Sequence, residues 1–170
     1  QSWIRPDKPI VSNSPAPQTW MRSNIYCPRV IYAEGKYRMW MNASPSPEDS
    51  WETVYGYVYE YWSDDGIDWT RRDRPAVEAT GNTKSCVYPD VHKINGTYYM
   101  WHIGHLKVKD GPMNLVYHEI FCDTSKDGTP WTLNHDMPAF AASRDLKRFD
   151  WKTVSTPCVV DVGDTLRLYY

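Results

Sequence analysis

Residues 27–41, Cys-Pro-Arg-Val-Ile-Tyr-Ala-Glu-Gly-Lys-Tyr-Arg-Met-Trp-Met, predict two short β-strands joined by a tight turn at Glu34-Gly35. Apolar residues lie on both sides of the turn, and Gly35 can adopt the positive φ that a two-residue hairpin requires. The same pattern returns at residues 88–102, Tyr-Pro-Asp-Val-His-Lys-Ile-Asn-Gly-Thr-Tyr-Tyr-Met-Trp-His, where the matching residue numbers are larger by 61. A third copy begins and ends within residues 156–170. A hairpin that occurs three times is an internal repeat, and it indicates an architecture of similar units.

A longer unit follows each of the first two hairpins. Residues 54–62 alternate between tyrosines and other residues, which predicts a strand with both faces in contact with other elements. Residues 63–70 then predict a turn in which Ser and Asp side chains bond nearby backbone amides. The second unit repeats this order with a strand at 115–123 and a turn at 125–132, and both turns read Ser-x-Asp-Gly-x-x-Trp-Thr. Each unit thus holds about four short strands in roughly 60 residues, which is the content of one propeller blade.

Three further segments are less regular. We expect a short strand at Pro9–Val11 before the first hairpin and another at Pro75–Val77 after the first turn. Residues 140–151 share the Ser-x-Asp start and the later tryptophan of the turn motif, but they lack its glycine. The sequence therefore leaves open whether 125–131 or 140–151 forms the outer hairpin of the second unit.

Composition excludes several classes of protein. The 170 residues can form one domain with a core, and a net charge of −2 gives no electrostatic reason to expect nucleic acid or an anionic membrane as a partner. No apolar run approaches the roughly 20 residues that a membrane span requires. Nine Trp and thirteen Tyr favour strands and offer flat surfaces to ligands. Cys27, Cys86, Cys122 and Cys158 lack zinc-type spacing, so we expect buried free thiols, with no metal and no cofactor, while a disulfide stays open.

Together these motifs carry a family resemblance. The order Pro-x-Val, Gly-x-Tyr-x-Met-Trp and Ser-x-Asp-Gly-x-x-Trp-Thr resembles the five-bladed β-propellers of the arabinanase, levansucrase and invertase superfamily, which includes glycoside hydrolase families 43, 32, 62 and 130. The resemblance implies an all-β fold built from four-stranded antiparallel blades, with about two and a half of the five blades in this chain. We expect a single partial propeller domain over residues 1–170, with an entry strand and loop at 1–24 and blades that begin at 25, 85 and 154 and run over 25–84, 85–153 and 154–170.

An incomplete propeller exposes an unpaired, aromatic strand edge, and such an edge favours association. We therefore expect either a fragment or a ring that a second chain completes, and a second copy of this chain could do so by pairing edges. The resemblance further implies an oligo- or polysaccharide as the partner and a secreted or periplasmic location.

Catalytic candidates follow from the same resemblance. Enzymes of the family 43 type resemble one another in an Asp before the repeat-start proline, in a second acid, and in a Glu that donates a proton, whereas this chain has Cys27, Tyr88 and Thr156 before its prolines. Asp90 follows its proline directly, and it would face the same way as Tyr88 if the strand is regular there. Asp90 is therefore our candidate for the base. Its alternative role is a hydrogen-bonded turn or a salt bridge to Arg29 across adjacent blades.

Glu119 is the candidate proton donor, because it lies in a predicted strand beside His118. Its alternative role is that of a solvent-facing strand residue. Trp40 and Trp101 recur with the repeat and are expected to pack between blades, whereas a tryptophan in the non-repeated loop is free to stack on a sugar ring. The candidate substrate-binding residues are Arg29, Trp51, His102 and His118.

Two functions remain in competition. The first is a glycoside hydrolase-like propeller that acts on or binds a glycan through paired carboxylates at the central channel. The second is a non-catalytic carbohydrate-binding or assembly propeller, which the missing acids before the prolines and the incomplete blade count favour. A weaker third possibility is a truncated repeat that closes a ring by self-association.

Overall fold

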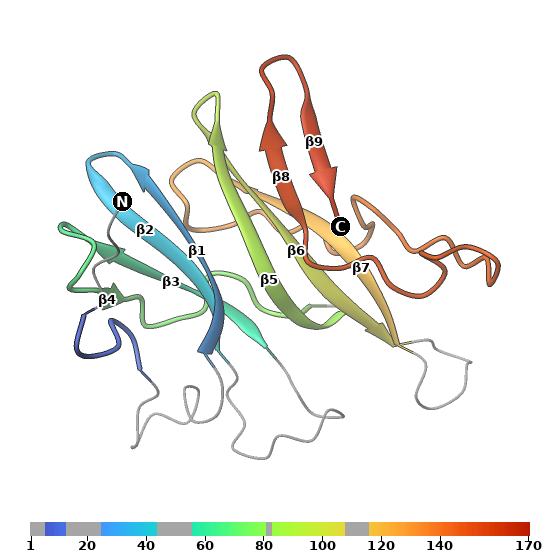
Figure 1. Ribbon diagram of the computed structural model, residues 1–170, viewed down its shortest axis with the longest axis horizontal. Coiled ribbons are helices and arrows are strands. Elements are labelled where there is room, and N and C mark those ends of the chain that lie inside the picture. Colours follow the sequence, from blue (N-terminus) through green and yellow to red (C-terminus); the bar gives the residue numbers. More distant parts are fainter. Residues whose placement is uncertain (1–5, 13–24, 44–55, 81–82, 108–115) are drawn as a thin grey trace.

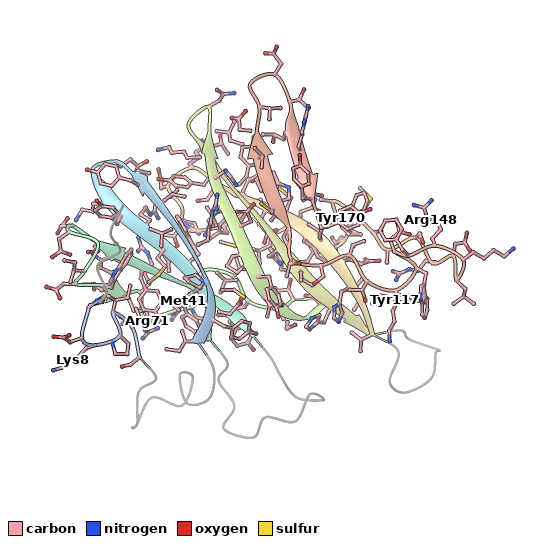
Figure 2. All side chains as sticks on the ribbon, in the orientation of Figure 1. Lys8, Met41, Arg71, Tyr117, Arg148 and Tyr170 are labelled. Carbon is pink, nitrogen blue, oxygen red and sulfur yellow. The ribbon has the colours of Figure 1, made fainter. Side chains whose placement is uncertain are left out.

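The computed structural model describes residues 6–12, 25–43, 56–80, 83–107 and 116–170. These residues form three antiparallel β-sheets and contain no helix. The sheets follow one another along the long axis of the molecule in the order of the chain (Figure 1). The described part of the chain accordingly offers no helix that could cross a membrane. We call β1–β4 the first sheet, β5–β7 the second and β8–β9 the third.

The first sheet contains the hairpin that the sequence predicts. Strands β1 (Ile25–Ala33) and β2 (Lys36–Ala43) pair antiparallel around a two-residue turn, with φ of 57° at Glu34 and 76° at Gly35. Strand β3 (Tyr57–Ser63) pairs with β2, and the two-residue strand β4 (Thr70–Arg71) completes the sheet. Both faces of β3 are largely buried, as its alternating pattern predicts.

The second and third sheets repeat this design with fewer strands. Strands β5 (Thr83–Ile94) and β6 (Thr97–Lys107) form the second hairpin, and β7 (Val116–Ser125) pairs with β6. Strands β8 (Cys158–Asp161) and β9 (Leu166–Tyr169) form the third hairpin. The expectation of four strands in each blade thus holds for the first sheet, while isolated bridges take the place of a fourth strand in the second.

Both candidates for the outer hairpin, residues 125–131 and 140–151, lie in the outer part of the second unit. The bridge Thr124–Thr132 corresponds to the pair Trp62–Thr70 of the first sheet, so the 125–132 turn supplies the outer hairpin. Residue Phe140 bridges Ile120, as Val77 bridges Val58 in the first unit. The extra length of the second unit therefore lies after Phe140.

Two strands that the sequence predicts, at residues 9–11 and 75–77, are not formed. Residues 9–11 form a bend rather than a strand, and Ile10 is exposed. Residues 75–77 contribute only the single bridge at Val77. Both segments contain or follow a proline, which cannot donate a backbone hydrogen bond to a ladder, so neither extends into a strand.

An apolar core lies between each pair of neighbouring sheets. Trp40 of β2, Met100 of β6 and Val58 of β3 belong to the core between the first and second sheets. Trp101 of β6 and Val159 of β8 belong to the core between the second and third sheets. The repeated tryptophan therefore packs each sheet against the next one, as its recurrence predicts.

Candidate functional site

Asp90 lies where the first strands of all three sheets come together. Its carboxylate Oδ1 is 3.0 Å from Nε of Arg29 on β1, and its Oδ2 is 3.2 Å from Nε2 of His92 on β5. The backbone N–H of Val159 on β8 donates to Oδ2 at 2.6 Å. The side chain of Asp90 is buried, and its carboxylate joins the three sheets.

A break in the strand places Asp90 there. Tyr88, the residue before the repeat-start proline, has φ of 58°, and the register between β5 and β6 shifts between Val87 and Asp90. One extra residue in a strand interrupts the alternation of side chains. Tyr88 contacts Tyr26 of the first sheet, whereas Asp90 reaches Val159 of the third. The expectation that Asp90 faces the same way as Tyr88 required a regular strand, and the register shift removes that condition.

The bulge belongs to the repeat and not to Asp90 alone. Cys27 and Thr156, which precede the other two repeat-start prolines, have φ of 54° and 50°. The first sheet has the same register shift, between Tyr26 and Arg29. A positive φ is uncommon for residues other than glycine, so three equivalent cases mark a feature that the fold imposes.

Arg29 is the accessible part of this site. Besides the ion pair with Asp90, its guanidinium lies 3.1 Å from Nε2 of His92 and donates to the carbonyl oxygen of Val91 at 3.4 Å. The salt bridge across adjacent blades, which the sequence offers as one role of Asp90, is therefore present. The Arg29 side chain remains 38% exposed, so a ligand at the inner strands can reach it.

Glu119 lies on the other face of the second sheet. Asp90 pairs in register with Trp101 of β6, and Trp101 packs toward the third sheet. Glu119 pairs with Gly104, which lies three residues after Trp101 on β6. Residues an odd number apart on a strand face opposite sides. The two carboxyl groups are also separated by the whole of β6, so they do not flank one glycosidic bond.

The surroundings of Glu119 suit a buried ion pair. Glu119 is buried and bonds to the guanidinium of Arg144 from the segment that follows Phe140. Burial raises the pKa of the Glu119 carboxyl, while the charge of Arg144 and a backbone hydrogen bond at Ala142 lower it in part. The alternative of a solvent-facing strand residue is thus wrong, because Arg144 and its segment cover this position.

His118 belongs to a pair of histidine rings next to Glu119. The ring of His118 lies 4.3 Å from that of His105, measured between centroids, and Nδ1 of His105 is 2.5 Å from Oγ of Ser85. Burial, with a further contribution from His118, lowers the pKa of His105 to about 4. Burial also lowers the pKa of His118. Both rings are therefore neutral near pH 7 and can accept hydrogen bonds.

We expect this histidine pair to make the fold sensitive to acid. His105 has a pKa of about 4 in the folded chain and about 6.5 when unfolded. Between these values the unfolded chain binds a proton that the folded chain excludes, so stability is lost as the pH falls from 6.5 to 4. The loss contributed by His105 is at most about 3 kcal/mol. Urea unfolding at several pH values should show that His105→Gln flattens this slope relative to the wild type, and equal slopes in the two proteins would contradict the expectation.

His102 is fully buried and does not line an accessible surface. Its Nε2 lies 2.9 Å from Oδ2 of Asp123, which is also 3.1 Å from Nε2 of His135. Although burial raises the pKa of Asp123, the hydrogen bonds from His102 and His135 lower it well below its usual range. The expected role of His102 in substrate binding is therefore not supported by its position. Trp51, the remaining candidate, lies outside the described residues.

A separate surface cavity of about 340 Å³ opens near the hairpin end of the first sheet. Arg38, Glu60, Trp62 and Arg72 are among its lining residues. Glu60 pairs with both arginines, so the charges of the cavity are largely satisfied within the wall. This cavity does not include Asp90, Arg29 or His92.

Sequence reasoning missed three residues that the fold brings to these sites. Arg144 reaches Glu119, and Cys86 and His135 approach His102. Arg144 and His135 lie in the irregular part of the second unit, where no repeat pattern guides the assignment. The contact between Arg144 and Glu119 could have been suggested only by their opposite charges, because one lies in an irregular segment and the other in a strand.

Solved structures of glycoside hydrolases share this fold at low sequence identity. A structure from glycoside hydrolase family 130 matches with a TM-score of 0.62 and 19% identity over 82% of this chain. That family is described as containing glycoside hydrolases that target β-1,2-mannosidic linkages in Candida mannan. A family 117 glycoside hydrolase from Zobellia galactanivorans matches with a TM-score of 0.64 and 16% identity over 86%. The family 32 β-fructofuranosidase of Bombyx mori matches with a TM-score of 0.60 and 13% identity over 89%.

These matches confirm the fold class, an all-β partial propeller. The chain covers 38%, 47% and 29% of the lengths of these three structures. No family model matches the sequence, and no curated protein matches it either.

Proposed function

We propose that this chain is part of a carbohydrate-active propeller of the glycoside hydrolase type, with Asp90 as its inner carboxylate. The observation that carries the proposal is the position of Asp90, which joins the first strands of three consecutive sheets. In a propeller the first strands of the blades surround the central channel. A carboxylate at this junction is suitably placed to meet a sugar at the channel.

The chemistry assigned to Asp90 is that of a carboxylate held in a fixed orientation. Arg29, His92 and the N–H of Val159 hold both of its oxygens, so the carboxylate is oriented before any sugar binds. An oriented carboxylate can act as a general base or stabilise positive charge at the anomeric carbon. The half-exposed guanidinium of Arg29 would donate hydrogen bonds to sugar hydroxyl groups.

Hydrolysis needs a second carboxyl group within about 5–10 Å of the first. Glu119 does not meet this requirement, because it lies on the opposite face of the second sheet. We therefore leave Glu119 out of the carboxylate pair and assign it to the ion pair with Arg144.

One observation favours the second candidate, a propeller that binds a glycan without cleaving it. Both oxygens of Asp90 are already occupied by protein donors, and the residues before the three repeat-start prolines are not acids. A carboxylate whose two oxygens are engaged in this way has fewer free lone pairs to offer a catalytic water. The two candidates share the site and differ only in turnover.

To distinguish the hydrolase from the propeller that only binds a glycan, binding and hydrolysis are measured on the same protein preparation. Native mass spectrometry first establishes which assembly is present. Binding is then measured on an array of oligosaccharides, and hydrolysis is measured with a panel of aryl-glycosides. We expect Asp90→Asn to abolish hydrolysis or to weaken binding, while Asp64→Asn, at an exposed turn, changes neither. Urea unfolding of both variants shows whether Asp90→Asn keeps the fold.

Each result has a defined meaning. Hydrolysis that disappears in a folded Asp90→Asn protein supports the enzyme, and binding without turnover supports the second candidate. If Asp90→Asn unfolds, Arg29→Lys provides the test, because it keeps the charge but loses the shape of the guanidinium. Full activity and full binding in a folded Asp90→Asn protein would exclude Asp90 from the site.

A further inference from the structure

A second cluster of polar side chains lies inside the core between the first and second sheets. Cys86 of β5, His102 of β6 and His135 each bring one ligand-type atom within 4.8 Å of the other two. Asp123 of β7 lies against both rings, with Oδ2 2.9 Å from Nε2 of His102 and 3.1 Å from Nε2 of His135. The side chains of His102 and Asp123 are 0% exposed, and that of His135 is 4% exposed. Three ligand-type atoms therefore meet at one buried point, and the carboxylate of Asp123 lies against the two histidine rings.

Each ring has an acceptor close to Nδ1 as well as the carboxylate of Asp123 close to Nε2. Nδ1 of His135 is 2.8 Å from the hydroxyl oxygen of Thr80, and Nδ1 of His102 is 3.3 Å from the carbonyl oxygen of Ile103. A neutral ring has one proton, so His102 cannot donate to Ile103 and to Asp123 at the same time. When the proton is on Nδ1, the lone pair of Nε2 is free. Histidines that bind metals typically donate their other N–H to a carbonyl or another acceptor in this way.

We propose that Cys86, His102, Asp123 and His135 bind one divalent transition-metal ion, and that zinc fits this set best. One sulfur, two imidazole nitrogens and one carboxylate oxygen are the ligand types of a tetrahedral zinc site. The Nε2–Oδ2 separations of 2.9 and 3.1 Å are close to the distance between neighbouring ligands around such an ion.

The charges and protons of this site balance. When the ion binds, a sulfur–metal bond forms, and the Cys86 thiol releases its proton to solvent without any transfer of electrons. A cysteine binds a metal as the thiolate, so this proton leaves as the ion binds. One thiolate and one carboxylate then neutralise the two positive charges of the ion. A neutral site avoids the cost of an uncompensated charge in the core.

The site is structural rather than catalytic. Four protein ligands leave no open position for water or substrate. The ion would connect β5, β6 and β7 to the segment after the 125–132 turn, where the backbone N–H of Asn134 also donates to Asp123 at 2.9 Å. This segment lacks a strand of its own beyond the bridge at Thr132, so a metal tie would fix it against the second sheet.

Cobalt binding tests the proposal without any enzymatic assay. The whole chain is freed of metal with a chelator, kept reduced and titrated with Co²⁺ while the absorption spectrum is recorded. We expect one Co²⁺ per chain, the strong ligand-field bands of tetrahedral cobalt and a thiolate-to-cobalt charge-transfer band, with Zn²⁺ displacing the cobalt. Cys86→Ser should remove the charge-transfer band, and His135→Gln should weaken binding by about tenfold or more.

Cys122→Ser is the matched control. Cys122 lies on β7 and packs toward the third sheet, so its loss should leave the cobalt spectrum unchanged. A wild-type chain that is folded by far-UV circular dichroism but shows no tetrahedral cobalt spectrum would overturn the proposal, and this result does not depend on any variant folding. A charge-transfer band that survives in Cys86→Ser and is lost in Cys122→Ser would overturn it as well.

Discussion

Replacing Glu60 by alanine is expected to lower the free energy of unfolding by about 3–5 kcal/mol, because it leaves a buried guanidinium without its carboxylate. Glu60 is 1% exposed and Arg38 is 7% exposed. Nε of Arg38 donates to Glu60 at 2.8 Å, and Nε of Arg72 donates to its other oxygen at 2.6 Å. Arg72 can turn toward solvent when Glu60 is removed, but Arg38 cannot.

The position of Arg38 explains why it cannot relax. Its Nη1 donates to the backbone oxygen of Asp127 at 2.7 Å, and its guanidinium lies 5.1 Å from the ring centroid of Trp40 and 4.8 Å from that of Tyr98. A Cβ atom on Gly128 would lie 2.5 Å from Cζ of Arg38, so the turn of the second unit closes directly over it. Arg38 thus ties β2 of the first sheet to the 125–132 turn.

Urea unfolding of wild type, Glu60→Ala and Asp64→Ala measures this prediction. Asp64 pairs with Lys36 at 3.0 Å, but both side chains are exposed, so its removal should cost no more than about 0.5 kcal/mol. The double variant Arg38→Met, Glu60→Leu should recover part of the loss, because it removes both charges together. A Glu60→Ala protein as stable as Asp64→Ala would show that the ion pair does not hold the two units together.

Local signals made the repeat units predictable. Gly35 and Gly96 lie at positive φ in two-residue turns, and Asn95-Gly96 is a strong hairpin signal. In the turn that begins at Ser63, its hydroxyl accepts the N–H of Gly66 at 2.8 Å, and Asp65 accepts the N–H of Ile67 at 2.8 Å. These bonds span two or three residues, so the sequence motif contains all of their partners.

The site could not be predicted in the same way, because its geometry depends on distant residues. Tyr88 has a positive φ although it is neither glycine nor asparagine. Its residue type therefore does not predict the bulge that sets the position of Asp90. The partners of Asp90 include Arg29 and Val159, which lie 61 and 69 residues away in the sequence. The alternation rule favours Asp90 and the position beside a histidine favours Glu119, so the sequence predicts as a pair two acids that the sheet separates.

Replacing Trp40 by alanine is the second change with a large expected effect, a loss of about 3–5 kcal/mol in the free energy of unfolding. Trp40 is fully buried, and its ring lies 6.1 Å from that of Tyr98 and 6.2 Å from that of Trp131, measured between centroids. Tyr98 and Trp131 both belong to the second unit, so one side chain of the first sheet anchors the contact between two sheets. Hydrogen-bonded strands on both sides prevent the core from closing around the space that the ring would leave.

The repeat supplies matched controls for Trp40. Trp101 occupies the same position 61 residues later, but it is 9% exposed and packs against a third sheet of only two strands, so Trp101→Ala should cost less. Tyr32 is 64% exposed, and Tyr32→Ala should cost less than about 1 kcal/mol. Urea unfolding should therefore rank the losses as Trp40, Trp101 and Tyr32. If Trp40→Ala cost as little as Tyr32→Ala, the stability of the chain would come from within each sheet. The junction at Asp90 would then lack the rigid support that a binding site between sheets requires.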